Sequence, residues 1–224
     1  MGPAPIAVKP VLGMIGGAGA LGTGLARRWV RAGYSLTIGS RDRGKAEDAA
    51  AALVVPEGGI KPRGASYTEA AASADIIVLT VPFTHQAAAL DEIKPVIQGK
   101  LILDATVPLF APNTALVRLP EAGSAAATAQ RRVDGVARVV SAFHNVPAKQ
   151  LLHDAAIDCD VLVFADDAAD RWAAIALVEA AGLRGVHGGP LANSAAAEAM
   201  TAVLIGINRN YKVGGVGLRI TGMD

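Results

Sequence analysis

A glycine-rich turn near the start of the chain restricts its possible folds more than any other segment. The stretch Gly17-Ala18-Gly19-Ala20-Leu21-Gly22 follows an apolar run at residues 11–15 and opens a helical pattern. Glycines at this spacing let the backbone approach a pyrophosphate, and the N-terminal end of the following helix supplies oriented N–H groups. The turn and its flanking elements therefore predict a dinucleotide-binding fold.

Short apolar runs alternate with helical patterns along the rest of the chain, which predicts an α/β fold with a doubly wound parallel sheet. The strand predicted at residues 76–81 is continuously apolar, as is typical of burial on both faces. Residues 54–64 hold two prolines and three glycines and are predicted to form a loop. The other strands are expected at residues 11–15, 35–39, 101–104, 136–142 and 161–164. Helices are expected at residues 21–32, 45–53, 68–73, 85–97, 124–133, 168–180 and 194–210.

The same pattern suggests three parts of unequal size. Residues 1–10 contain three prolines and no apolar core of a signal peptide, so we expect a disordered leader. Residues 11–147 are predicted to be the dinucleotide-binding domain. Residues 148–224 would form a small C-terminal α/β lobe, close to the size at which an independent core becomes marginal. We expect this lobe to pack against the first part and to complete a ligand cleft.

The tip of the second predicted strand indicates which dinucleotide is bound. NAD-dependent proteins usually carry a carboxylate there to hold the ribose hydroxyls. This chain carries Ser40 and Arg41, followed by Arg43 and Lys45. A hydroxyl and cations suit a 2′-phosphate, so NADP(H) is expected. Two alternatives stay open: an ordinary polar turn, or presentation of Asp42 to a bare ribose.

Three later segments lie at predicted strand ends, where a doubly wound sheet binds its ligand. Main-chain groups of Val81 and the side chain of His85 are placed to contact the ribose or adenine, although His85 also fits a surface helix position. Segments 104–108 and 141–147 are expected at the nicotinamide end. Within the second, His144 fits an acid–base catalyst, a hydrogen-bond donor to a bound ring, or a core histidine with satisfied hydrogen bonds.

Composition excludes several other classes of function. The formal net charge is +1 without clustered Lys and Arg, which argues against a nucleic-acid partner or a membrane surface. Cys159 is the single cysteine, and no Cys/His spacing predicts a metal site. Its neighbours Asp158 and Asp160 oppose thiolate formation, so we interpret it as structural. These features predict a soluble cytoplasmic protein that acts on small molecules.

Three segments in this order go beyond the generic fold. They are residues 15–22 together with Gly39-Ser40-Arg41, then Ser141-Ala142-Phe143-His144-Asn145-Val146-Pro147-Ala148, then Gly189-Pro190-Leu191-Ala192-Asn193-Ser194. From about residue 10 to the C-terminus, the chain resembles the NADPH-dependent coenzyme F420 reductases, also called F420:NADP oxidoreductases. The resemblance implies direct and reversible hydride transfer between NADP(H) and the deazaflavin F420.

The resemblance also implies a set of binding residues and no dedicated catalytic residue or metal. One departure is Asp42, at a position that is basic in the resembled family; this weakens phosphate binding unless Arg43 substitutes. NADP(H) contacts are implied at Gly17, Ala18, Gly19, Ala20, Leu21, Ser40, Arg41, Lys45, Val81, His85, Val107 and Val146. Contacts to the deazaflavin are implied at His144, Pro147, Val216 and Gly217.

Two rival functions are compatible with the same fold. One is an NADP-dependent reductase of an imine or keto acid, although such enzymes usually have a longer helical C-terminal half and a Lys, Ser or Asp proton donor. The other is a non-catalytic NADPH-binding sensor module. A homodimer is expected in either case, because the final predicted helix carries apolar residues such as Met200 and Val203.

Overall fold

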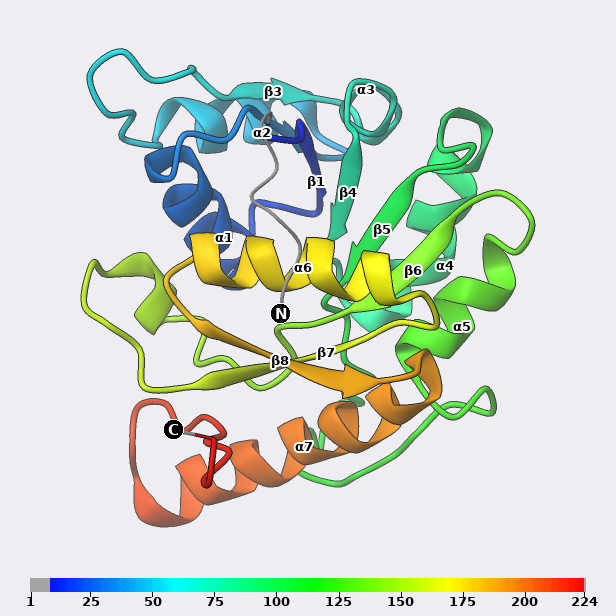
Figure 1. Ribbon diagram of the computed structural model, residues 1–224, viewed down its shortest axis with the longest axis vertical. Helices are drawn as coiled ribbons and strands as arrows, with labels where there is room; N and C mark the ends of the chain where they lie inside the picture. The colour runs from blue at the N-terminus through cyan, green and yellow to red at the C-terminus, as the bar shows by residue number, and fades with distance from the viewer. Residues whose placement is uncertain (1–8, 224) are drawn as a thin grey trace.

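An eight-stranded sheet organises the molecule in the computed structural model, which describes residues 9–223 (Figure 1). Its strand order is β3-β2-β1-β4-β5-β6-β7-β8. Neighbouring strands are parallel except β6 and β7, which run antiparallel and share one residue pair. The predicted α/β class with a doubly wound, mostly parallel sheet is confirmed. The antiparallel junction was not predicted.

The strands follow the apolar runs of the sequence closely, with two exceptions. They are β1 (Leu12–Ile15), β2 (Leu36–Gly39), β3 (Arg63–Ala65), β4 (Ile76–Leu79), β5 (Leu101–Asp104), β6 (Arg138–Ser141), β7 (Asp160–Phe164) and β8 (Arg184–Gly189).

The two exceptions are the edge strands β3 and β8. The end of the predicted loop at 54–64 is wrong, because Arg63 and Gly64 begin β3. β8 has the sequence RGVHGG, with three glycines and little apolar character, and was not predicted. An edge strand pairs with one neighbour only and needs little apolar surface. β3 and β8 therefore cannot be predicted from apolar runs in the sequence.

The helices begin and end within a few residues of their predicted bounds. They are α1 (Ala20–Arg31), α2 (Arg43–Ala51), α3 (Tyr67–Ala72), α4 (Phe83–Ile93), α5 (Ala125–Arg132), α6 (Ala168–Ala180) and α7 (Ser194–Tyr211), with short 3₁₀ turns η1 (Lys94–Val96), η2 (Gln150–Leu152) and η3 (Leu191–Asn193).

Helices cover both faces of the sheet, and each face has its own apolar core. On one face α1, α2 and α6 bury residues such as Trp29, Ala46 and Leu177. On the other face α3, α4 and α5 bury residues such as Leu90 and Ala129. Alanine supplies much of the helical surface, so the helices pack closely on the strands. This arrangement explains why the central strands are apolar without alternation.

The strand register brings the functional segments to one edge of the sheet. Ile15 at the end of β1 pairs with Gly39 and Leu79, and Asp104 at the end of β5 pairs with Leu79 and Ser141. The loops that follow β1, β2, β4, β5 and β6 therefore leave from the same level. That carboxyl edge is where doubly wound sheets bind ligands.

The chain after residue 147 adds strands β7 and β8 to the same sheet and contributes helices α6 and α7. Figure 1 shows α7 and the C-terminal segment together beside β7 and β8, at one end of the molecule. The expected leader at residues 1–10 falls mostly on residues 1–8, which lie outside the described residues.

Candidate functional site

A cleft of about 670 Å³ runs along the carboxyl edge of the sheet. It contains most of the residues expected to bind the dinucleotide, contributed by the loops after β1, β2, β4 and β5. The lining residues are Gly16, Ala18, Gly19, Ala20, Leu21, Gly22, Ser40, Arg41, Asp42, Lys45, Tyr67, Thr80, Val81, Pro82, His85, Ala105, Thr106, Val107 and Leu109.

The glycine turn has the close packing that a phosphate-binding loop needs. Gly16 has a φ of 83°, and a Cβ there would lie 2.5 Å from the Val81 side chain. A Cβ on Gly22 would lie 2.7 Å from Gly17 Cα, so α1 sits directly on the turn. By contrast, a Cβ on Gly19 would meet nothing within 4 Å. The open side of the turn, at the N-terminus of α1, is therefore accessible to a phosphate.

Side chains at the tip of β2 separate into those that face the cleft and those that do not. Ser40, Arg41, Asp42 and Lys45 all line the cleft. The Asp42 carboxylate caps α2 by accepting a hydrogen bond from the Lys45 backbone N–H at 3.3 Å. Arg43 lies outside the cleft lining, since it pairs with Glu47 and Glu69 at 3.1 Å each. The expectation that Arg43 could replace a basic residue at position 42 is therefore not supported by this geometry.

Three other residues expected to contact the dinucleotide also line this cleft, namely Val81, His85 and Val107. Two do not. Gly17 lies beneath the turn, where an added Cβ would approach Met14 and Ile38. Val146 lines a different pocket, which is described next.

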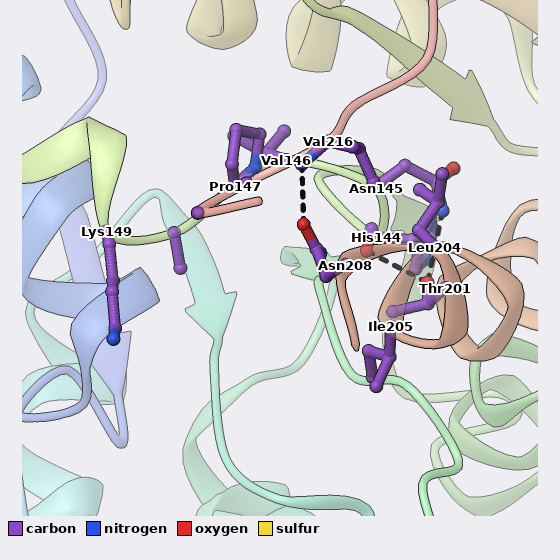
Figure 2. Close-up of a pocket in the computed structure, with 13 residues that line it drawn as sticks. His144, Asn145, Val146, Pro147, Lys149, Thr201, Leu204, Ile205, Asn208 and Val216 are labelled. Atoms are coloured by element: carbon purple, nitrogen blue, oxygen red, sulfur yellow. Dashed lines mark hydrogen bonds between the residues drawn. The ribbon is translucent and has the colours of Figure 1, made fainter. Parts of the chain in front are cut away.

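A second pocket, of about 220 Å³, lies between the loop after β6, helix α7 and the C-terminal tail (Figure 2). Its walls are largely apolar. The lining residues are His144, Asn145, Val146, Pro147, Ala148, Lys149, Thr201, Leu204, Ile205, Asn208, Gly214, Gly215 and Val216. Since β5 and β6 are adjacent strands, the loops that wall the two pockets leave neighbouring positions of one sheet edge.

His144 is the most informative side chain of this pocket. It is 6% exposed, and burial lowers the pKa of its imidazole to about 4. Its Nε2 atom has no hydrogen-bond partner among residues 9–223. A neutral imidazole with an unpaired ring nitrogen does not fit a core histidine with satisfied hydrogen bonds. His144 instead fits a residue whose ring nitrogen forms a hydrogen bond with a bound ligand.

Hydrogen bonds to α7 hold the loop around His144 in place. The Asn145 side-chain amide donates to the Ala197 carbonyl at 2.8 Å, and the Thr201 hydroxyl donates to the His144 carbonyl at 2.9 Å. The preceding residue, Phe143, has a φ of 68° and packs edge-on against Trp29 with 5.9 Å between ring centroids. A non-glycine residue in this conformation is strained and persists only where its surroundings hold it.

The tail reaches the second pocket with one of its two expected residues. Val216 lines the pocket, and its backbone N–H donates to Asn208 Oδ1 at 3.1 Å (Figure 2). Pro147 also lines the pocket and lies against the tail, because a Cβ on Gly215 would lie 2.8 Å from the Pro147 Cβ. Gly217 instead packs on Cys159, where an added Cβ would lie 2.6 Å from the sulfur. Burial raises the pKa of the Cys159 thiol, and the charges of Asp160 and Asp158 add to this effect.

Two carboxyl groups are buried near the site: Glu198, which the sequence analysis missed, and Asp104, which belongs to the segment 104–108 expected there. Glu198 of α7 accepts hydrogen bonds from the backbone N–H groups of Ala125 and Ala126, at 2.6 and 3.1 Å. Asp104, at the end of β5, accepts from Gln86 at 2.7 Å. Burial raises the pKa of Glu198 to about 7 and that of Asp104 to about 6. Glu198 lies in an ordinary helical pattern, so only the contact between α7 and α5 reveals it.

Replacing Glu198 with glutamine should change how stability depends on pH. A carboxyl group whose pKa is raised on folding stabilises the protein below its unfolded pKa of 4.5, and this contribution is lost as the pH rises through about 7. The shift corresponds to about 3 kcal/mol at most. His144 acts in the opposite sense, because its lowered pKa costs stability as the pH falls from 6.5 towards 4.

The measurement is thermal unfolding of wild type and Glu198→Gln between pH 5 and pH 8. The amide also loses one acceptor, which shifts the melting temperature equally at every pH. The melting temperature of the variant relative to wild type should rise from pH 5 to about pH 7 and level off above that. A constant difference across this range would show that Glu198 does not titrate there.

Within residues 9–223, no three His, Cys, Asp or Glu side chains are grouped so as to hold a metal ion. In the same part of the chain, no helix is both long and apolar enough to cross a bilayer.

The fold and the first cleft define a class, the Rossmann-type dinucleotide-binding proteins. A family model described as "NADP oxidoreductase coenzyme F420-dependent" matches residues 11–108. The F420-dependent NADP reductase of Methanothermobacter marburgensis is 37% identical over 95% of this chain and 98% of its own length. That of Methanothermobacter thermautotrophicus is 39% identical over 95% of both chains. The chain belongs to the family of F420-dependent NADP reductases.

A solved structure from Arthrobacter sp. FB24, described as a "putative f420 dependent nadp-reductase", has the same fold. It superposes with a TM-score of 0.78 at 22% identity, over 95% of this chain and 99% of that one.

Proposed function

We propose that this protein transfers a hydride directly and reversibly between NADP(H), bound in the cleft after β1 and β2, and coenzyme F420, bound in the pocket beside α7. Family membership supports the reaction, since the relatives that match over nearly the whole chain are F420-dependent NADP reductases. The observation that carries the assignment is the second pocket. It combines apolar walls with one buried ring nitrogen that has no hydrogen-bond partner among residues 9–223, Nε2 of His144, next to the dinucleotide cleft.

The residues of the first cleft fit NADP(H). The open glycine turn and the N-terminus of α1 would hold the pyrophosphate. Ser40, Arg41 and Lys45 would hold the 2′-phosphate, because all three line the cleft. Asp42 lines it too, but its carboxylate accepts the capping hydrogen bond of α2. Val81, His85 and Val107 would line the remainder of the dinucleotide.

The residues of the second pocket fit a flat, partly polar ring. NADP(H) and F420 supply the redox chemistry, a hydride donor and a hydride acceptor. Val146, Pro147 and Val216 would hold the ring between apolar surfaces and exclude water. Neutral His144 would donate its ring N–H to a carbonyl or nitrogen of the acceptor. No side chain is required to act as a nucleophile, so positioning is the main contribution of the protein.

The decisive experiment mixes the purified protein with NADPH and oxidised F420 and follows loss of the visible absorbance of the deazaflavin. Turnover supports the proposal. NADPH binding without turnover on F420 or on imine and keto-acid substrates would point to the sensor function. Turnover on an imine or keto acid alone would point to the other reductase class.

We propose further that the protein works as a cytoplasmic homodimer. Met200 and Val203 of α7 are 37% and 42% exposed, and Leu116 in the loop after β5 is 47% exposed. Exposed apolar side chains of this kind are common at subunit interfaces. Light scattering after size exclusion should give twice the chain mass of 22.7 kDa. A monomer at micromolar concentration would contradict the dimer.

A further inference from the structure

A tyrosine stands at the end of the cleft where the 2′-phosphate is expected. Tyr67 begins α3 and lines the cleft together with Ser40, Arg41 and Lys45. Its ring is part of the apolar core beneath α3 and α4, and the residue is only 7% exposed. A tyrosine with a buried ring and a hydroxyl at a cleft has little freedom to move, so its polar tip is held in one place.

The neighbour of that hydroxyl is the Arg41 guanidinium. Burial raises the pKa of the Tyr67 phenol, while the charge of Arg41 and a hydrogen bond from it lower the pKa again. A guanidinium can only donate hydrogen bonds, so towards Arg41 the phenol oxygen can act only as an acceptor. The phenol O–H is then left to donate to a group in the cleft, which it lines together with Arg41. An anion beside Arg41 would provide the acceptor.

Most other cations at this end of the cleft are paired with carboxylates, so an additional hydrogen-bond donor would strengthen phosphate binding. Arg43 is held by Glu47 and Glu69, away from the cleft. The Lys45 ammonium is 3.9 Å from the Asp42 carboxylate, which offsets part of its charge. Glu92 also faces Tyr67 and raises the pKa of the phenol. Arg41 is therefore the one cation at this end of the described chain that has no acidic partner, and a neutral donor beside it adds to phosphate binding without charge.

We propose that Tyr67 is a specificity-determining residue, whose hydroxyl is oriented by Arg41 and donates a hydrogen bond to the 2′-phosphate of NADP(H). The proposal rests on the proposed function, because it needs the phosphate to bind at this end of the cleft. Arg41 and Tyr67 then recognise NADPH together. Arg41 supplies a positive charge, and Tyr67 supplies a hydrogen-bond donor held in one orientation. NADH lacks the phosphate and gains nothing from the phenol.

The test compares wild type with Tyr67→Phe, which removes only the hydroxyl. Isothermal titration of the full chain with adenosine 2′,5′-bisphosphate and with 5′-AMP isolates the 2′-phosphate, since the ligands differ in that group alone. Tyr67→Phe should weaken binding of the bisphosphate about 5- to 20-fold, as expected for one hydrogen bond to a charged group, and leave 5′-AMP unchanged. With F420 as acceptor, KM for NADPH should rise by a similar factor while kcat stays constant.

The matched control is Tyr34→Phe, which removes the hydroxyl of a tyrosine that is also 7% exposed but lies in the other apolar core. It should bind both ligands as wild type does. Equal weakening of both ligands by Tyr67→Phe would assign the residue to packing and overturn the proposal, as would no change with either ligand. If wild type itself fails to prefer the bisphosphate, the NADP(H) assignment falls as well, and the two failures are thereby distinguished.

Discussion

Replacing Arg41 with alanine should lower kcat/KM for NADPH about 10- to 150-fold and leave kcat/KM for NADH nearly unchanged. Arg41 faces the cleft beside Ser40 and Lys45. A charge-assisted contact to a phosphate contributes about 1.5–3 kcal/mol, which corresponds to that range of rates. Steady-state kinetics with each nucleotide and saturating F420 measure the effect. The loss should shrink as the salt concentration is raised.

Arg43→Ala provides the matched control, because this arginine lies two residues further on and pairs with Glu47 and Glu69 instead. Both ion pairs are exposed, so their removal should cost little stability. The preference for NADPH should remain as in wild type. Equal losses for the two nucleotides in Arg41→Ala, or a loss of preference in Arg43→Ala, would contradict the assigned phosphate site.

A tryptophan at position 214 should abolish most of the activity with F420 and spare NADPH binding. Gly214 lines the second pocket, and a Cβ added there meets nothing within 4 Å. The indole can therefore be accommodated by the backbone but competes with a ligand for space in a pocket of about 220 Å³. Displacing one reacting ring by about 1 Å can cost about 100-fold in rate, and we expect a loss of at least that size.

The control for this variant is Gly214→Ala, which adds one methyl group at the same place and should retain most of the activity. Titration with NADPH should give the same affinity for wild type and both variants. Unaltered turnover of F420 by Gly214→Trp would mean that the acceptor binds elsewhere. A loss of NADPH affinity would instead show that the two pockets are not independent.

The central part of the fold could be predicted because each of its elements carries a local signal. β1, β4 and β5 are runs of apolar residues, and α6 was placed with both ends correct at Ala168 and Ala180. β8 could not be predicted, since Gly188 is required by the Phe164 ring, 2.2 Å from where its Cβ would lie. Because the residue type at position 188 is set by contact with a distant side chain, the local sequence shows no preference for a strand.

The candidate site divides in the same way. The glycine turn and Arg41 belong to contiguous motifs, so their place in one cleft followed from strand order alone. Tyr67 and Glu198 could not be found, because each acquires its importance from a partner remote in sequence, Arg41 in the first case and the N-terminus of α5 in the second. Residue spacing in the sequence does not indicate which distant residues will be in contact.

The junction between β6 and β7 has a consequence for how this kind of enzyme diversifies. The strands meet through the single pair Ser141 and Phe164, so few backbone hydrogen bonds tie the later strands to the earlier ones. The residues that line the first cleft all precede that junction, whereas the second pocket is lined by the loop after β6, by α7 and by the tail. Changes confined to α7 and the tail would therefore reshape the second pocket for a different acceptor while the lining of the nucleotide cleft stays the same.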